Sequence, residues 1–374
     1  MKRQEIRTIN VAQWLACLSI LVAGCQTAPV ASSLLFMSGT GNNHTAVASI
    51  DTTKQAGALV LVNTDSSRAR YPTYSHSRKS LLYSTEVEDN VYKLWIANAD
   101  GTQVNELTSS FLSAADIDAH WSYNDEFIAY ISSANRYALS THDMIIMKVH
   151  SDEEQSRKIA SGITAYAWSP IDNRIAMIQW DTSLDSSGLY ILGTDGSQKS
   201  FFSAKSIPGM GPASTNLAWS PDGRYIAITG VPNEMNPLTG VQTTVEEVIT
   251  VNVETGKVEQ LAEKQLDLVE RNIRCLRWSP DTHKILFVAD YTASNKQSRQ
   301  GALVIVDTQQ STEIQIADHL DWSCPAWSPS GHEVAFVMVD NPQNYYGDIF
   351  VANIDAESVR RLTNDTRPKY DLSW

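Results

Sequence analysis

The chain has 374 residues, a formal net charge of −13 and four Cys, and 19% of its residues are charged. The acidic balance argues against a nucleic-acid-binding protein, because neutralising phosphates requires an excess of Lys and Arg. Four Cys are too few for a disulfide-rich scaffold of this length. A hydrophobic fraction of 43% is too high for a disordered chain. Length alone favours two or three domains, although a single all-β domain is often longer than this estimate assumes.

The N-terminus has the pattern of a secretion signal. Three basic residues lie in the first seven positions, and a mostly apolar run of 14 residues extends from Val11 to Gly24. This run is too short to cross a bilayer as a helix, which needs about 20 residues. We therefore predict a signal peptide over residues 1–24.

The sequence at residues 22–25, Val-Ala-Gly-Cys, resembles the lipobox of bacterial lipoproteins. The resemblance implies that Cys25 receives the lipid and becomes the N-terminus, with residues 25–33 as a short linker. An ordinary secretory signal with an incidental Cys is the alternative. Gln26, rather than Asp, follows the Cys and favours the periplasmic face of the outer membrane. No later apolar run approaches 18 residues, so the lipid is the only membrane contact that we predict.

One aromatic context recurs along the rest of the chain. Six of the ten Trp share a context beside a Ser, four of them in Trp-Ser-Pro, and a seventh copy has Tyr in the Trp position. Consecutive copies are 47 to 59 residues apart, a period that indicates a repeat architecture. The seven positions are Tyr74, Trp121, Trp168, Trp219, Trp278, Trp327 and Trp374.

Each copy is followed by a turn and further strands. In the clearest turn, at residues 221–223, Pro fixes φ, Asp can bond back to the backbone, and Gly accepts a positive φ. An apolar strand follows at 225–229, then a variable loop, a third strand and a weaker fourth strand. Four antiparallel strands in about fifty residues are typical of a β-propeller blade. We interpret the repeated Trp as core between blades, and not as a ligand cage.

The number of copies predicts seven blades closed by strands from both ends. Trp374 opens a seventh unit, and three further strands are predicted at 34–37, 46–50 and 58–62. Placing these four strands in one blade pairs the exposed edges of the ring. We therefore expect a single all-β propeller domain over residues 34–374, with six blades plus loose ends as the alternative.

The repeat resembles the TolB-type, or WD40-like, β-propeller family. The resemblance rests on the Trp-Ser-Pro-Asp-Gly turn at 219–223, its partial copies, and the tails at 98–108 and 353–363. It covers nearly all of the chain after the signal and implies the propeller fold. It says little about activity, because functions are grafted onto folds.

Motifs for catalysis or metal binding are not recognisable. The Gly-rich stretch at 39–44 lacks the third Gly of a dinucleotide loop, no Gly-x-Ser-x-Gly elbow is present, and the eight His show no zinc-ligand spacing. We therefore predict no cofactor, no metal and no enzymatic activity. His120, beside Trp121, is a candidate for lining the central channel, although a packed or solvated His is commoner.

Cys275 and Cys324 each lie three residues before a repeat Trp. They therefore occupy equivalent positions on the inner strands of consecutive blades. In an oxidising compartment we predict a disulfide between them, with two buried free thiols as the alternative.

Partner-binding residues are expected on the variable loops, where aromatic and charged side chains suit binding hot spots. Local packing of these side chains is the alternative. The candidates are Arg136, Tyr137, Trp180, Asp181, Tyr291, Tyr345 and Tyr346.

These features together predict a monomeric, lipid-anchored envelope propeller that binds a protein partner or another ligand. A propeller enzyme or carbohydrate-binding protein acting at the central channel is one alternative. A purely structural envelope lipoprotein is the other.

Overall fold

The computed structural model describes residues 33–41, 44–53, 59–62, 68–88, 91–108, 112–113, 119–133, 142–149, 156–181, 186–207, 209–210, 216–230, 244–261, 268–293, 300–320, 323–339, 347–365 and 367–374. The predicted signal peptide and lipid site lie outside these ranges, as do four of the loop candidates. These residues are Cys25, Arg136, Tyr137, Tyr345 and Tyr346.

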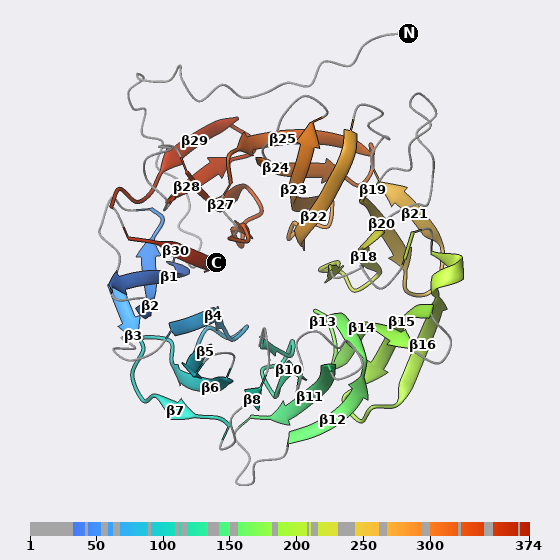
Figure 1. The fold of residues 1–374 in the computed structure, drawn as a ribbon, viewed down its shortest axis with the longest axis horizontal. Helices are drawn as coiled ribbons and strands as arrows, with labels where there is room; N and C mark the ends of the chain where they lie inside the picture. The colour runs from blue at the N-terminus through green and yellow to red at the C-terminus, as the bar shows by residue number, and fades with distance from the viewer. Residues whose placement is uncertain are drawn as a thin grey trace, which may run out of the picture.

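Six groups of consecutive strands form blades around a ring, and the fourth strand of each blade lies on the outside (Figure 1). The first blade consists of β4 (Arg68–Tyr74), β5 (Ser80–Glu88), β6 (Val91–Asn98) and β7 (Asn105–Glu106), with β8 (Leu112–Ser113) beside β6. The second consists of β9 (His120–Trp121), β10 (Phe127–Ser133), β11 (His142–Lys148) and β12 (Ser156–Ser161). The third consists of β13 (Ile163–Trp168), β14 (Arg174–Asp181), β15 (Ser186–Gly193) and β16 (Gln198–Ser203).

The next three blades repeat this order. The fourth consists of β17 (Leu217–Trp219), β18 (Tyr225–Gly230), β20 (Glu247–Asn252) and β21 (Val258–Leu261). The fifth consists of β22 (Leu268–Trp278), β23 (Lys284–Ala293), β24 (Gln300–Asp307) and β25 (Thr312–Asp318), with β19 (Thr244–Val245) beside β22. The sixth consists of β26 (Ala326–Trp327), β27 (Glu333–Met338), β28 (Asp348–Asn353) and β29 (Ser358–Arg361).

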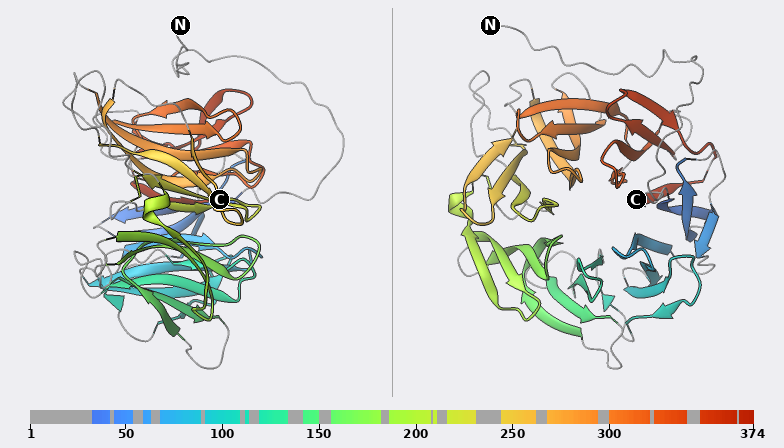
Figure 2. Two further views of the ribbon diagram at one scale, coloured as in Figure 1. Left: turned by 90° about the vertical axis from the view of Figure 1, so that its right-hand side faces the viewer. Right: turned by 180° about the vertical axis from the view of Figure 1, so that it is seen from behind.

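The seventh blade joins the two ends of the described chain. Its strands run in the order β30 (Lys369–Ser373), β1 (Ser33–Gly41), β2 (His44–Asp51) and β3 (Leu59–Val62). Both β2 and β30 pair antiparallel with β1, and Leu35 lies opposite Ser373. The C-terminus lies at the inner side of the ring, both from the front (Figure 1) and from behind (Figure 2, right). One parallel bridge, between Thr45 and Arg68, joins β2 to β4, so this blade and the first blade belong to one nine-stranded sheet. Counted by their antiparallel strands, the described residues form seven blades, including the shared closing blade that the repeat count predicted.

In five blades, the Ser after the repeat aromatic residue builds the first turn. Ser220 Oγ accepts a hydrogen bond from Tyr225 N at 2.9 Å and donates to Asp222 Oδ1 at 2.6 Å. Gly223 completes the turn with a φ of 71°. Four other buried serines accept from the residue five positions later in the same way, so the repeated Ser is structural. They are Ser75, Ser122, Ser279 and Ser328.

The repeated Trp side chains connect neighbouring blades. All five from Trp121 to Trp327 are buried, with at most 9% of their surface exposed. Trp168 Nε1 donates to His120 O at 3.1 Å, and Trp278 Nε1 donates to Ala218 O at 3.1 Å. Each acceptor immediately precedes the repeat Trp of the preceding blade. The interpretation of these residues as core between blades is confirmed.

Helical structure contributes little to the described residues. Within the described residues, a 3-10 turn at Ala204–Ser206 follows β16. Within the described ranges, no helix has the length and apolar character needed to cross a bilayer.

Candidate functional site in the central channel

A cavity of about 900 Å³ occupies the centre of the ring. Every blade contributes a residue from its inner strand or the adjoining segment, and the proline turns at Pro170, Pro221 and Pro329 also line the cavity. The cavity therefore reaches the face that carries the first turns. One lining residue from each blade is Tyr74, His120, Tyr166, Asn216, Arg277, Cys324 and Trp374.

The structure places His120 at this cavity, on β9. Its ring packs edge-on against Tyr166, with the centroids 5.7 Å apart. The Tyr166 hydroxyl donates to Ala129 O at 2.8 Å, which fixes the aromatic pair against the neighbouring blade. His120 is thus a partly exposed residue of the channel wall, held by packing from β13.

Cys275 and Cys324 are joined in a disulfide, with their Cα atoms 5.3 Å apart. Both residues line the cavity. The bond connects β22 to the segment before β26, so it links the inner strands of two consecutive blades.

The position three residues before the repeat aromatic carries a second kind of link. Cys275 N donates to Asn216 Oδ1 at 3.1 Å, and Tyr71 N donates to Asp371 Oδ2 at 3.2 Å. Cys275, Tyr71 and Asp371 all have positive φ, between 50° and 63°. A side chain in one blade therefore caps a strained backbone position of the next blade. Sequence reasoning identified this position for the two Cys and missed Asn216 and Asp371, which share the spacing.

Positive side chains line the cavity wall. Arg78 Cζ lies 4.7 Å from the centroid of the Tyr74 ring, and its Nη2 donates to Ser33 O at 3.1 Å. Burial lowers the pKa of Arg78, and it raises the pKa of Tyr74 although Arg78 opposes that shift. Arg277 is exposed, and its Nη1 donates to Leu276 O at 3.1 Å. Sequence reasoning did not select either Arg.

Three loop candidates have described backbones, each toward the end of a second strand. Trp180 and Asp181 end β14, and Tyr291 lies near the end of β23. Their side chains are outside the described part of the structure. Their role in partner binding stays a prediction. Among the described residues, no group of three His, Cys, Asp or Glu is arranged to hold a metal ion.

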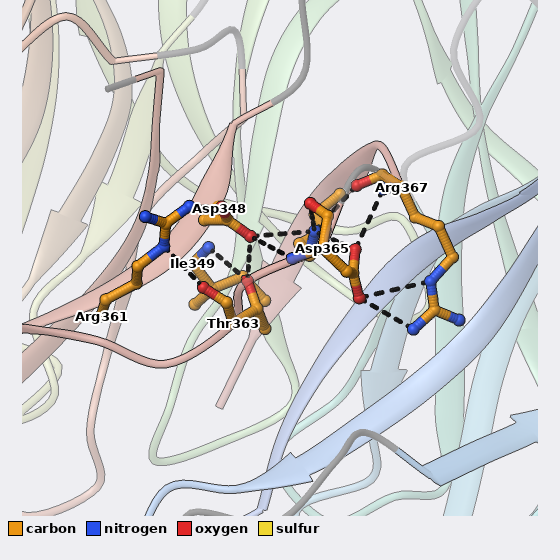
Figure 3. Close-up of polar contacts among 7 residues, drawn as sticks. Asp348, Ile349, Arg361, Thr363, Asp365 and Arg367 are labelled. Atoms are coloured by element: carbon orange, nitrogen blue, oxygen red, sulfur yellow. Dashed lines mark hydrogen bonds and ion pairs between the residues drawn. The ribbon is translucent and has the colours of Figure 1, made fainter. Parts of the chain in front are cut away.

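A buried polar network lies beside the closing strand (Figure 3). Lys369 Nζ lies 3.2 Å from Asp348 Oδ1 and donates to Asp365 Oδ1 at 2.8 Å. Thr363 Oγ1 donates to Asp348 Oδ1 at 2.8 Å and accepts from Ile349 N at 2.9 Å. The side chains of Lys369 and Asp348 are 1% and 2% exposed. This network fixes the start of β30 to the preceding blade.

Opposing effects act on the two carboxylates of this network. Burial by itself would raise the pKa of Asp365, but hydrogen bonds from Arg367 and Lys369 outweigh it and lower the pKa to about 2. Burial also opposes ionisation of Asp348, and its contacts with Arg361, Thr363 and Lys369 lower its pKa nonetheless. Both carboxylates are therefore held in the charged form.

Seven four-stranded blades around a lined channel define a β-propeller. The family of the dipeptidyl peptidase IV N-terminal region matches residues 279–372. No curated protein sequence matches the chain.

Solved structures with the same fold span most of the chain. TolB from Acinetobacter baumannii has 15% identity and a TM-score of 0.52, and the match covers 92% of this chain and 82% of that one. An oligogalacturonate lyase in complex with manganese has 9% identity and a TM-score of 0.55, with 88% and 84% covered. A putative 6-phosphogluconolactonase from Bacteroides uniformis has 12% identity and a TM-score of 0.56, with 91% and 98% covered. These likenesses support the resemblance to TolB-type propellers at the level of the fold. The same fold likeness is found with a lyase and with a putative lactonase.

Proposed function

We propose that this chain is a monomeric binding protein of the bacterial cell envelope, attached by a lipid on Cys25 at the periplasmic face of the outer membrane. Its role is to hold a segment of a protein partner or another ligand in the central channel. The Val-Ala-Gly-Cys sequence at residues 22–25 supports the anchor, and the likeness to TolB is consistent with an envelope location.

The observation that carries the proposal is the cavity of about 900 Å³ at the ring centre. Ligand sites in proteins are concave, largely preformed and typically 300–1,000 Å³ in volume. Here the walls are preformed by the links between blades, because the disulfide and the Asn216 cap both lie on them. A rigid wall costs little ordering when a ligand binds.

A channel-filling variant tests the proposal. Thr164 lines the cavity on β13, so Thr164→Trp should occupy part of it. A soluble form starting after Cys25, immobilised and exposed to envelope extract, should retain a partner that the Thr164→Trp form releases. Thr255→Trp, on an exposed turn, is the matched control and should retain the partner.

A variant of the predicted loop residues provides the second comparison in this experiment. If a form with Ala at Trp180, Tyr345 and Tyr346 loses the partner while Thr164→Trp keeps it, the partner binds the variable loops and the channel proposal is wrong. If neither form differs from wild type, both assignments are wrong. Equal melting temperatures for all forms are required for the comparison.

A further inference from the structure

The charge of the cavity is opposite to that of the whole chain. The net charge is −13, yet the described side chains that line the cavity include Arg78 and Arg277 and no Asp or Glu. Two guanidiniums without an acidic side chain among the described lining residues give the cavity a positive potential, which the terminal carboxylate of Trp374 offsets in part. The cavity is therefore suited to an anionic ligand.

Arg78 shows why an anion fits this site. Its guanidinium is half-buried, and its contacts in the described structure are a backbone carbonyl and the face of Tyr74. Neither contact carries a full negative charge. A guanidinium removed from water is stabilised most by a carboxylate, which it can bind through two parallel hydrogen bonds.

Arg277 provides a second cation on a distant wall. It lies on β22, whereas Arg78 follows β4, and Figure 1 shows these two strands on opposite sides of the ring. Its contact in the described structure is the carbonyl of Leu276. A ligand that reaches both cations needs at least two anionic groups separated by an extended body.

The remaining walls favour a sugar body over a peptide. Tyr74 and Trp374 are partly exposed rings, and Ser373 supplies a hydroxyl group. Aromatic faces and hydroxyl groups match the C–H faces and hydroxyls of a pyranose.

A peptide would pair with the free edges of the inner strands. Some backbone carbonyls of these inner strands already accept hydrogen bonds from the next blade. The carbonyls of His120, Ala218 and Arg277 accept hydrogen bonds from repeat Trp indoles.

We propose that the channel binds a short oligosaccharide carrying carboxylate groups, with Arg78 and Arg277 each holding one carboxylate. This inference rests on the proposed binding function and names the ligand class. It is a binding site only, and no bond is made or broken in the ligand.

Calorimetry on the soluble form tests the inference with trigalacturonate as the probe. Its methyl ester has the same rings without charge and should bind at least about tenfold more weakly. Arg277→Gln and Arg78→Gln should each weaken trigalacturonate binding by about tenfold or more, and rising salt should weaken it further. Arg360→Gln, on β29 and outside the cavity lining, should bind like wild type.

Several results would overturn the inference. Equal binding of the ester, or unchanged affinity in both Arg variants, excludes carboxylate recognition but leaves a ligand-binding channel. Tighter binding of pentaglutamate than of trigalacturonate assigns the site to an acidic peptide instead. No binding of any probe, together with partner capture that depends on the channel, removes this inference and retains the proposed function. If Arg78→Gln does not fold, Arg277→Gln decides.

Discussion

At the scale of single residues, the first turn of each blade repeats one backbone conformation with different side chains. The fourth residue after the repeat aromatic has a φ between 55° and 75° in five blades. Glycine occupies this left-handed conformation without strain, whereas a β-branched residue does not. The five residues are Arg78, Asp125, Gly223, Thr282 and Gly331.

Thr282→Gly should stabilise the protein. Relief of left-handed strain contributes about 1–2 kcal/mol, and the greater freedom of glycine in the unfolded chain offsets part of it. We expect a net gain of up to about 1 kcal/mol in the free energy of unfolding, measured from urea unfolding curves. The reciprocal change, Gly223→Thr, should destabilise, because Thr would have to adopt the left-handed φ of 71° and would also displace the Ile171 side chain. A loss of stability in Thr282→Gly would contradict the strain argument.

The low pKa of Asp365 makes stability depend on pH. Its folded pKa of about 2 lies below the ordinary value of 3.8, so its stabilising contribution is complete above about pH 4 and is lost as the pH falls toward 2. In Asp365→Asn, the free energy of unfolding should therefore fall less steeply across this window than in wild type. Glu254→Gln, on an exposed turn, should follow the wild-type curve. Parallel curves for Asp365→Asn and wild type would show that Asp365 does not contribute to the pH dependence of the free energy of unfolding.

At the scale of elements, β30 closes the ring. It pairs with β1 along its backbone, and Leu372 and Trp374 pack in the cluster that contains Phe36. Deleting residues 370–374 should sharply lower the melting temperature, because it exposes the edge of β1 and leaves the core of the closing blade open. A synthetic peptide of residues 367–374 should restore part of the loss. Unchanged melting would show that the ring does not depend on this strand.

The disulfide is the second device at this scale. Cys275 and Cys324 are 49 residues apart in sequence, and closing a loop of this length typically stabilises a protein by about 2–4 kcal/mol. The double Ser variant of the soluble form should lose about that much, and reduced wild type should match it. Alkylation of denatured, unreduced protein should label no thiol, since these are the only Cys after residue 25. Two labelled thiols would exclude the bond.

At the scale of the whole molecule, the predicted anchor decides where the propeller resides. Cys25→Ser should abolish palmitate labelling and release the protein from the membrane fraction, because a lipid chain is the only membrane contact that we predict. Cys17→Ser, within the predicted signal core, is the matched control and should retain labelling. Undiminished labelling of Cys25→Ser would contradict the lipobox interpretation.

The fold could be predicted from sequence because each blade repeats the same local chemistry. The Ser hydroxyl and the turn residues recur at fixed distances from the repeat Trp, and the copy number reveals the shared closing blade. The candidate site could not be predicted to the same extent. The period assigns Cys275 to the channel wall, but it does not show that Arg78 and Arg277 meet the same cavity across the ring. Lys369 is fully buried against the usual preference of charged residues, so its pairing with Asp348 could not be read from hydropathy.

The closing strand also belongs to the cavity, since Ser373 and Trp374 line it. Its contact with β4, from Tyr71 N to Asp371 Oδ2, joins residues 300 positions apart. Opening of this one strand would therefore remove part of the binding wall and unseal the ring in a single event. By thermodynamic linkage, any ligand held against that wall stabilises the closed ring to the extent that it binds the closed form better. Occupancy of the channel and closure of the seventh blade are thus coupled equilibria, and each shifts the other.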